Sequence, residues 1–392
     1  MDVVRIGGLV AAVVLALVTA ALLALRAMPP PQPVNPHAAD ATRPAAAVPL
    51  APAEVALSFA RIESPRGTRL LRVRAIHDSI VGAEDVTDAD PAAAGADPVA
   101  LLSALGWEGA AALRGPPVGA DVASLLPPWP APPVQIAMGI NYPEHGRETA
   151  QDAGFVFPKP VVPGPSRGTV AVRGGLLDYE VELGIVPLAP ARPGAPTPAF
   201  GLVLASDFTD RAALMRRFRI GDIGSGHGFP VAKGMADSLP AGPVLVVPRD
   251  PAAFLAGLTL RLWVNGELRQ VAEPRLLVWP LPRMIAESVA RGGMVWDGPA
   301  GPLRLPVVDG TIPAGTLILS GTPEGTVFRA PDARQITLGV VEWLLGFGAG
   351  GTNRIMEPAI RDGFAGGAYL QPGDEVVMQA DGLGEIRVTI VP

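Results

Sequence analysis

The chain contains no cysteine, which excludes disulfide bonds, thiolate zinc sites and thiol nucleophiles together. Charged residues are scarce as well, at 17% of the 392 residues, and a net charge of −6 offers no basic surface for nucleic acid. A hydrophobic content of 49% favours a largely globular chain, long enough for two or three domains. The 45 prolines and 46 glycines indicate many turns and argue against a helical bundle.

A run without any charged side chain stands near the start of the sequence. It covers residues 6–25 and lies between Arg5 and Arg26. A helix of that length, at ~1.5 Å per residue, matches the ~30 Å hydrocarbon core of a bilayer. Because no clean signal-peptide cleavage site follows, we expect residues 1–28 to form an uncleaved transmembrane anchor. With its N-terminus inside, that anchor would place the rest of the chain on the periplasmic or extracellular side.

Composition divides the remainder into three regions. Residues 29–54 are rich in proline and alanine, which predicts an extended, semi-rigid tether. Residues 55–128 hold two strand-like segments and a helix that Asp97 would cap, as in a small α+β domain. Residues 129–392 contain many short strand-like segments, with an insertion at about 329–368. We therefore predict an α+β fold that is mainly β, and not a doubly wound sheet.

Acidic side chains alternate along the segment GLLDYEVELGIV, residues 175–186. Read as a strand, this segment places Asp178, Glu180 and Glu182 on one face. Asp207 ends another apolar strand, and no histidine or cysteine stands among these acids. Carboxylate oxygens of this kind suit Mg²⁺, Mn²⁺ or Ca²⁺. An E-x-E pair on a strand is also common at a solvated edge, and Asp178 fits a supporting role.

A histidine and a glutamate stand three residues apart in GINYPEHGRE, residues 139–148. If a helical turn begins there, His145 and Glu148 share a face. A carboxylate bonded to one imidazole nitrogen orients the ring and leaves the other nitrogen to deprotonate water. A lone loop histidine without a function is the alternative. The other histidines have no such neighbour: His37, His77 and His227.

Two further loops carry groups that could hold an anion. Lys233, in VAKGMADSLPAGP, could bind a substrate carboxylate or stabilise an enolate. Gly321 and Thr322, in SGTPEGT, offer a backbone N–H and a hydroxyl at the end of a strand. A surface lysine and a plain turn are the simpler interpretations of these two loops.

Taken in order, these segments resemble the fumarylacetoacetate hydrolase family. The resemblance covers roughly residues 130–392 without the insertion, and its specificity comes from the order and spacing of eight blocks. The blocks are GINYPEHGRE, FPKP, LDYEVELGIV, ASDFTDR, AKGMADSLPAGP, LWVNGELRQ, LSGTPEGT and LQPGDEVVMQADGLGEIRVTIV. It implies a β-roll catalytic domain, generally homodimeric, that acts on a small oxo-acid substrate.

The resemblance also implies roles for single residues. It implies a divalent cation, Mg²⁺ or else Mn²⁺ or Ca²⁺, held by Glu180, Glu182 and Asp207. It implies that His145, paired with Glu148, activates water. The implied reaction is hydrolysis of a C–C bond in a 1,3-dicarbonyl acid of the acylpyruvate or fumarylacetoacetate type, through a metal-bound enolate.

Five other residues of the family blocks are implied to act on the substrate or to bind it. Lys233 is implied to take part in catalysis. Thr322 and Gly321 are implied to bind the substrate carboxylate or oxyanion. Lys159, in FPKP, and Arg211, in DFTDR, are further expected substrate contacts.

Some features depart from the family pattern and leave alternatives open. Ser206 replaces a common asparagine, and Leu214 replaces a polar residue, which puts the identity of the substrate in doubt. The same scaffold supports decarboxylation of 2-oxo diacids and isomerisation or hydration of dienols. A membrane-tethered binding protein without catalysis is another alternative. GFGAGG, residues 346–351, matches a dinucleotide-binding motif literally, but Pro358 interrupts the helix that such a motif requires.

Overall fold

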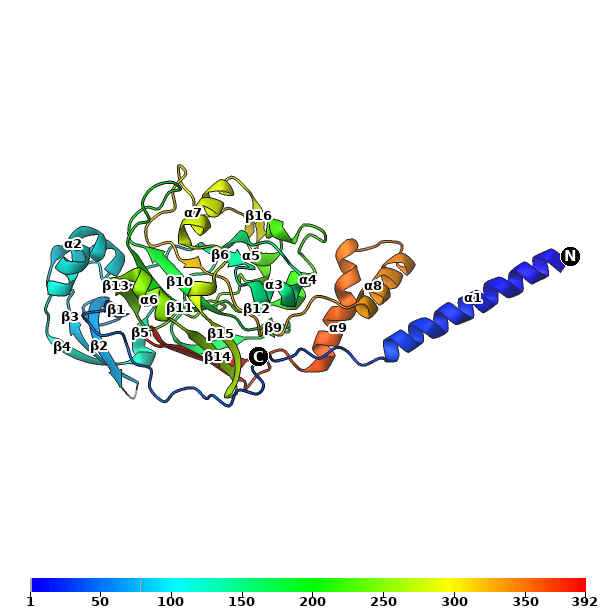
Figure 1. Cartoon of the computed structure of the whole chain (residues 1–392), viewed down its shortest axis with the longest axis horizontal. Coiled ribbons are helices and arrows are strands. Elements are labelled where there is room, and N and C mark those ends of the chain that lie inside the picture. Colours follow the sequence, from blue (N-terminus) through cyan, green and yellow to red (C-terminus); the bar gives the residue numbers. More distant parts are fainter. Residues whose placement is uncertain (1, 78) are drawn as a thin grey trace.

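We describe a computed structural model of the chain, in which residues 2–77 and 79–392 are described; the side chains of residues 2–12, 14 and 15 are not. The molecule is elongated, with helix α1 (Asp2–Ala27) extending from one end of a body made mostly of strands (Figure 1). Strands dominate the body, in agreement with the expected mainly β, α+β class.

The larger sheet holds eleven strands, ten of them in the order β4-β3-β2-β1-β13-β11-β10-β18-β6-β7, while β5 pairs with β1. Their bounds are Pro117–Asp121 (β4), Ile80–Asp85 (β3), Arg69–His77 (β2), Ala56–Ile62 (β1), Leu245–Pro248 (β13), Phe200–Ser206 (β11), Val181–Pro187 (β10), Ile318–Leu319 (β18), Gln135–Gly139 (β6), Phe155–Lys159 (β7) and Leu125–Leu126 (β5). Strand β1 pairs with β13, so the N-terminal strands extend the sheet that carries β10 and β11. Both β10 and β11 are buried almost throughout, which explains their nearly continuous apolar sequences.

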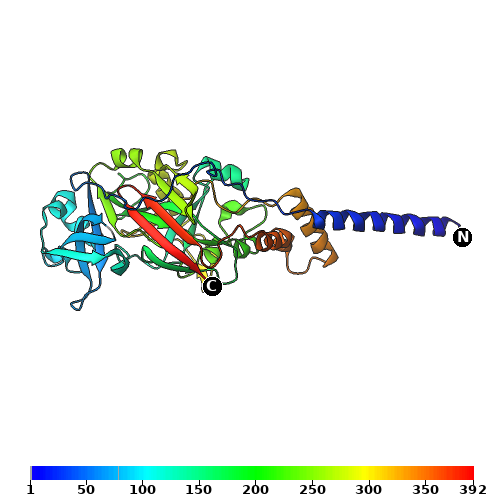
Figure 2. The ribbon, with the colours of Figure 1, turned by 90° about the horizontal axis from the view of Figure 1, so that it is seen from below.

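A second sheet of five strands packs against the first, in the order β15-β14-β19-β20-β8 (Figure 2). These strands span Glu267–Ala272 (β15), Leu260–Val264 (β14), Glu375–Ala380 (β19), Gly384–Val391 (β20) and Arg167–Ala171 (β8). Asn265 and Gly266 both have positive φ, of 51° and 79°, which suits a tight hairpin turn between β14 and β15. Two small pairs complete the strands: Leu177–Asp178 (β9) with Thr209–Asp210 (β12), and Trp296–Gly298 (β16) with Gly301–Leu303 (β17).

Short helices surround the sheets. They span Pro98–Ala112 (α2), Pro143–Thr149 (α3), Arg211–Met215 (α4), Phe229–Ala232 (α5), Pro251–Gly257 (α6), Leu281–Ala290 (α7), Ala333–Leu345 (α8) and Glu357–Gly366 (α9), with 3₁₀ turns at Pro91–Ala93, Val122–Ser124, Ile223–Ser225, Pro274–Leu276 and Thr352–Met356 (η5). The carboxylate of Asp97 accepts from the N–H of Val99 at 2.9 Å, so the expected cap of α2 is confirmed.

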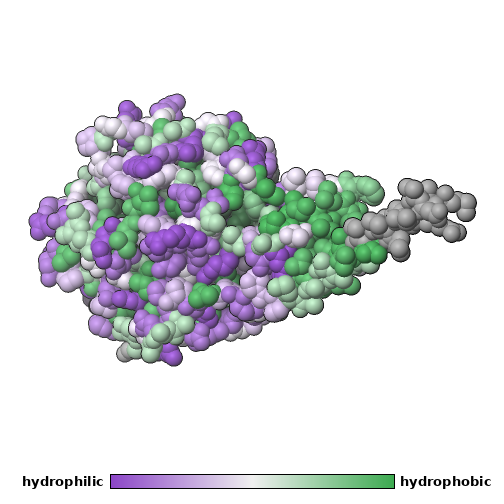
Figure 3. Space-filling model, turned by 45° about the vertical axis from the view of Figure 1, so that its right-hand side comes forward, coloured by the Kyte–Doolittle hydropathy of each residue, from purple (hydrophilic) through white to green (hydrophobic). Residues whose placement is uncertain are grey.

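The segment expected to be an insertion forms α8, η5 and α9, which pack on one another between the body and α1 (Figure 1). Asp332 caps α8 through a reciprocal capping box with Gln335. Leu338 is buried, whereas Leu345 and Phe347 at the far end of α8 are exposed. Hydrophobic surface accordingly gathers at the end of the molecule where α1, α8 and α9 lie (Figure 3).

The predicted membrane anchor at residues 1–28 is wrong, and with it the predicted export of the rest of the chain. Among the described residues, no helix combines the length and the apolarity that crossing a bilayer requires. A span needs about 20 consecutive apolar residues, and the described side chains of α1 comprise only Val13 and the stretch from residue 16 to 27. The earlier part of the predicted anchor lies outside the residues whose side chains are described.

The proline- and alanine-rich segment runs extended along the second sheet and is fastened to it. The side chain of Asn35 donates to the carbonyl of Leu268 at 3.0 Å. Ala45 exchanges two hydrogen bonds with the side chain of Gln379, at 2.9 and 2.8 Å. These contacts hold the segment against β15 and β19.

Candidate active site

The pairing of β10 with β11 brings the three expected metal ligands together. Val181 stands opposite Ser206 in the register, and the N–H of Asp207 donates to the carbonyl of Glu180 at 3.0 Å. Glu180 and Glu182 are two residues apart and share a side of the strand. One carboxylate oxygen from each of Glu180, Glu182 and Asp207 lies within 4.8 Å of the other two, and all three side chains are buried.

The carboxylates of Glu180, Glu182 and Asp207 together form a set of ligands that suits a hard divalent cation. Burial, and then the charges of Asp207 and Glu180, raise the pKa of Glu182 well above its usual value. Oδ2 of Asp207 accepts no hydrogen bond of good geometry, although it lies 2.9 Å from Nζ of Lys233. Three neighbouring buried acids repel one another and are stabilised by positive charge, and oxygen-only donors match Mg²⁺, Mn²⁺ or Ca²⁺. The geometry does not distinguish among these ions.

Three cationic side chains contact these acids, and two of them, Lys233 and Arg211, also line a cavity. Nζ of Lys233 lies 2.7 Å from Oε2 of Glu180 and 2.9 Å from Oδ2 of Asp207. Burial alone would lower the pKa of Lys233, but the charges of Asp207 and Glu180 outweigh it and raise that pKa. Arg211 donates to Oδ2 of Asp178 at 2.8 Å and to Oε1 of Glu180 at 2.6 Å. Although burial favours the neutral acid, Lys233 and Arg211 together lower the pKa of Glu180.

The expected continuous strand through the acidic segment is interrupted. Strand β9 ends at Asp178, and β10 begins only at Val181. Besides Arg211, Asp178 accepts from the N–H groups of Val327 and Phe328, at 2.9 and 3.0 Å. These bonds turn its carboxylate away from the metal ligands, and Asp178 thus ties the loop after β18 to the site.

Helix α3 carries the expected histidine–glutamate pair. Nδ1 of His145 lies 3.1 Å from Oε2 of Glu148, and both side chains are buried. Pro143 stands in the first turn of α3, and Ala150, with a left-handed φ of 54°, ends it. Because Nδ1 is engaged by the carboxylate, Nε2 is the ring nitrogen left for proton transfer.

Lys159 does not occupy the place expected of a substrate contact. Its side chain is fully buried, and Nζ lies 2.5 Å from Oδ1 of Asp207. Nζ also donates to the carbonyl of Lys233 at 2.8 Å and to Oγ of Ser238 at 3.1 Å. Lys159 therefore holds Asp207, one of the expected metal ligands, in place. The chain has no lysine other than Lys159 and Lys233, so every lysine ammonium of the sequence lies here.

The turn after β18 reaches the site from the other side. The N–H of Gly321 donates to Oε2 of Glu182 at 2.6 Å, and so it orients a metal ligand. A Cβ at Gly321 would lie 3.0 Å from Cβ of Asn141, and its φ is 89°, so glycine is required there. Oγ1 of Thr322 donates to the carbonyl of Val181 at 3.2 Å.

A cavity of about 250 Å³ lies against part of this cluster; Glu180 is the one expected metal ligand in its described lining. His145, Glu180, Arg211, Lys233 and Thr322 all line it. The remaining lining is mostly aliphatic and aromatic. A concave apolar space with a few convergent polar groups is typical of a small-molecule site.

Comparison with known families decides the identity of the fold. Residues 135–391 match the sequence model of the fumarylacetoacetate (FAA) hydrolase C-terminal domain, which is well over half of the chain. The chain belongs to the fumarylacetoacetate hydrolase family. Enzymes of this family act on small molecules, and the buried acids described above agree with a divalent cation. No curated protein sequence matches this member of the family.

Solved structures share the family fold. A putative HpcE protein from Mycobacterium smegmatis is 21% identical with a TM-score of 0.54, over 85% of this chain and 99% of that chain. Fumarylacetoacetate hydrolase from psychrophilic Exiguobacterium antarcticum is 22% identical with a TM-score of 0.51, over 86% and 99% of the two chains. Maleylpyruvate hydrolase from Sphingobium sp. SYK-6 is 24% identical with a TM-score of 0.51, over 85% and 99%. At these identities the likeness establishes the fold alone.

Two residues of this family member escaped the sequence analysis. Gln270 is fully buried, donates to Oγ1 of Thr322 at 3.0 Å and accepts from the N–H of Val181 at 2.9 Å. Arg329 lies 2.7 Å from Oε1 of Glu148 and so adds a cation behind the histidine–glutamate pair. A polar residue on the buried side of an alternating strand was the available signal for Gln270. Nothing local distinguished Arg329 from a surface arginine.

Proposed function

We propose that the protein is a divalent-metal-dependent hydrolase that cleaves a C–C bond in a 1,3-dicarbonyl acid of the acylpyruvate class. The observation that carries this proposal is that His145, the member of the histidine–glutamate pair with a free ring nitrogen, lines the same cavity as the metal ligand Glu180. A proton acceptor and a cation site then face one substrate-sized space.

The bound cation would be held by Glu180, Glu182 and Asp207, and it would polarise the substrate carbonyl oxygens and offset developing negative charge. His145 takes a proton from water at Nε2, while Glu148 holds the ring in place through Nδ1. The water oxygen bonds to the distal carbonyl carbon of the substrate. The bond between that carbon and the neighbouring CH₂ then breaks, and its electron pair stays on the CH₂ carbon.

The last step returns the proton to the product, and other residues of the site bind the charged end of the substrate. The proton on Nε2 of His145 passes to that carbon, which gives pyruvate and a carboxylic acid. Lys233 and Thr322 line the cavity and hold the 2-oxo acid end of the substrate. Gly321, which orients Glu182, and Lys159, which orients Asp207, keep the ligand geometry fixed.

The test measures pyruvate release from acetylpyruvate by the full chain with Mg²⁺, Mn²⁺ or Ca²⁺. Replacing the general base in His145→Ala should lower kcat/KM by about 10²–10⁴-fold. His77→Ala, at an exposed histidine of β2, is the matched control and should leave the rate unchanged. Decarboxylation of oxaloacetate or isomerisation of a 2-hydroxydienoate, without acylpyruvate cleavage, would replace this proposal with one of the alternatives on the same scaffold.

A further inference from the structure

The cavity also indicates what the substrate carries beyond its 2-oxo acid end. We infer that the acyl group is an uncharged apolar chain or ring, and not one that ends in a second carboxylate. This inference rests on the proposed function, because it names the substrate class of the same site.

The first argument is the pairing of every charged group that lines the cavity. His145 contacts Glu148, Arg211 contacts Asp178 and Glu180, and Lys233 contacts Glu180 and Asp207. Among the described residues that line the cavity, these three and Glu180 are the charged ones. With Lys233 assigned to the 2-oxo acid end, Arg211 is the remaining permanent cation of the described lining, and two carboxylates already engage it. A second substrate carboxylate would find no free partner there, and burying an unpaired carboxylate is strongly unfavourable.

The second argument is the aromatic wall formed by β7 and α5. The rings of Phe155 and Phe229 have centroids 4.9 Å apart at a steep interplanar angle, and Phe157 and Phe229 lie 5.0 Å apart. All three rings line the cavity. A rigid aromatic surface of this kind favours an apolar partner of defined shape.

Three more apolar side chains form a second wall of the lining. Leu214 and Phe218, on and just after α4, line the cavity together with Phe328. The guanidinium carbon of Arg211 lies 5.2 Å from the centre of the Phe328 ring, so the ring covers one face of that cation. The cation nearest to this wall is therefore engaged by two carboxylates and one aromatic ring.

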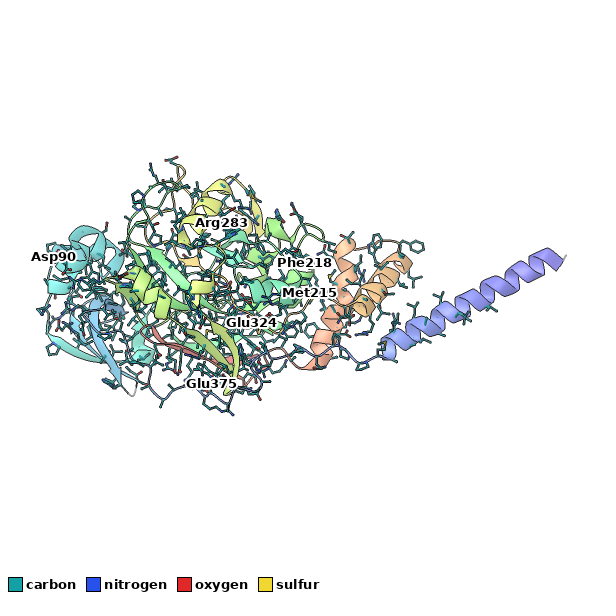
Figure 4. All side chains as sticks on the ribbon, viewed as in Figure 1. Asp90, Met215, Phe218, Arg283, Glu324 and Glu375 are labelled. Carbon is teal, nitrogen blue, oxygen red and sulfur yellow. The ribbon has the colours of Figure 1, made fainter. Side chains whose placement is uncertain are left out.

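The inserted helices hold this wall in place. The side chain of Asn353, in η5, donates to the carbonyls of Phe218 and Met215, at 2.7 and 3.1 Å. Arg216 pairs with Glu357 at 2.8 Å, and Met356 adds a thioether to the lining. Phe218 and Met215 accordingly lie where the body meets the inserted helices (Figure 4).

A substrate series tests the inference directly. The full chain with Mg²⁺ is assayed with acetylpyruvate, pentanoylpyruvate, benzoylpyruvate and succinylpyruvate, the last being similar in length to pentanoylpyruvate but ending in a carboxylate. Each methylene buried against the apolar walls should raise kcat/KM about fourfold. We expect pentanoylpyruvate and benzoylpyruvate to exceed acetylpyruvate at least tenfold and succinylpyruvate to be the poorest. Succinylpyruvate equal to or better than pentanoylpyruvate would overturn the inference.

A charge placed in the wall should reverse the preference. Phe218→Arg should lower kcat/KM for pentanoylpyruvate and raise it for succinylpyruvate, and Phe218→Ala should flatten the dependence on chain length without favouring the diacid. Leu344→Arg, on the exposed side of α8, is the control and should change neither substrate. An unchanged ratio of the two substrates in Phe218→Arg and Phe218→Ala, with both proteins folded by circular dichroism, would contradict the inference.

Failure of the proposed function gives a different result. If no acylpyruvate is cleaved, thermal shift with Mg²⁺ compares 2-oxoheptanoate with 2-oxoadipate, which differ only in a distal ethyl or carboxylate group. A larger stabilisation by 2-oxoheptanoate supports the apolar substrate class even though hydrolysis fails. Equal stabilisation, a preference for 2-oxoadipate, or no binding of either acid overturns it.

Discussion

Nζ of Lys159 lies 2.5 Å from Oδ1 of Asp207, and both side chains are fully buried. Burial lowers the pKa of Lys159, although the charge of Asp207 opposes this effect. The pair sets Oδ1 of Asp207 toward Lys159, while Oδ2 of the same carboxylate lies 2.9 Å from Nζ of Lys233 on the side of the expected metal site.

Removal of the lysine should destabilise the protein in a metal-dependent way. In Lys159→Met, Asp207 loses its buried partner, and breaking such a pair costs about 3–5 kcal/mol. We expect the free energy of unfolding, measured in urea with EDTA, to fall by that amount. With saturating Mg²⁺ the fall should be smaller, because the cation would compensate the negative charge of Asp207. An identical loss with and without Mg²⁺ would mean that Asp207 does not contribute to metal binding.

The three acids Glu180, Glu182 and Asp207 should bind a divalent metal ion even when no substrate is present. Because the chain has only two lysines, ¹³Cε-lysine labelling gives two resonances from Lys159 and Lys233, both in contact with Asp207. Titration with Mg²⁺ should shift both resonances with saturation. Loss of a residue that merely supports a metal ligand lowers metal affinity roughly 10–100-fold. In Asp207→Ala, which removes an expected ligand itself, the affinity for Mg²⁺ should fall by more than that. Glu267→Ala, at an exposed carboxylate of β15, is the control. Lysine resonances that do not shift on addition of Mg²⁺ would contradict metal binding by these acids.

Arg329 should tune the histidine–glutamate pair. Glu148 accepts from Gly325 at 2.9 Å and contacts Arg329 at 2.7 Å on one oxygen, while its other oxygen contacts His145. Without the arginine, the carboxylate favours a protonated imidazole more strongly. In Arg329→Met the acid limb of the kcat/KM profile should therefore move to higher pH. Arg329→Lys should return the acid limb to its wild-type position. If Arg329→Met lowers the rate without moving the acid limb, the role of Arg329 is purely structural.

Acid should loosen the inserted helices. The hydrogen bond from Arg216 is the first cause that lowers the pKa of Glu357 below its ordinary 4.5. A carboxyl with a depressed folded pKa contributes stability above its unfolded pKa and loses it as pH falls through the folded pKa. Hydrogen exchange over α8 and α9 should accelerate as pH falls below about 4.5, after correction for intrinsic rates. Glu357→Gln should exchange faster already at pH 7 and lack this component of the pH dependence.

Local spacing predicted part of the site. His145 and Glu148 stand three residues apart on α3 and meet as that spacing requires. Glu180 and Glu182 share a side of the strand segment because they are two residues apart. Asp207 was predicted from its place at the end of another apolar strand, and the β10–β11 register places it beside them. The assigned roles of these residues and the expected homodimer stay predictions.

What the sequence could not provide depends on contacts between distant segments. Gln270 reaches Thr322 across 52 residues, and Lys159 reaches Asp207 across 48, through pairing that no local pattern encodes. The interruption between β9 and β10 comes from Asp178, which bonds to the distant loop at Val327. The membrane prediction was wrong because, among the described residues, no helix is both long and apolar enough to cross a bilayer.

The most direct test of the central claim follows oxygen from solvent. Pentanoylpyruvate is incubated with the full chain and Mg²⁺ in H₂¹⁸O, and the pentanoate formed is analysed by mass spectrometry. Water activated at His145 predicts one ¹⁸O atom in each pentanoate, loss of the reaction in EDTA, and a strong decrease in His145→Ala. Turnover that yields no labelled pentanoate, or that proceeds unchanged in EDTA or in His145→Ala, would contradict metal-dependent hydrolysis at this site.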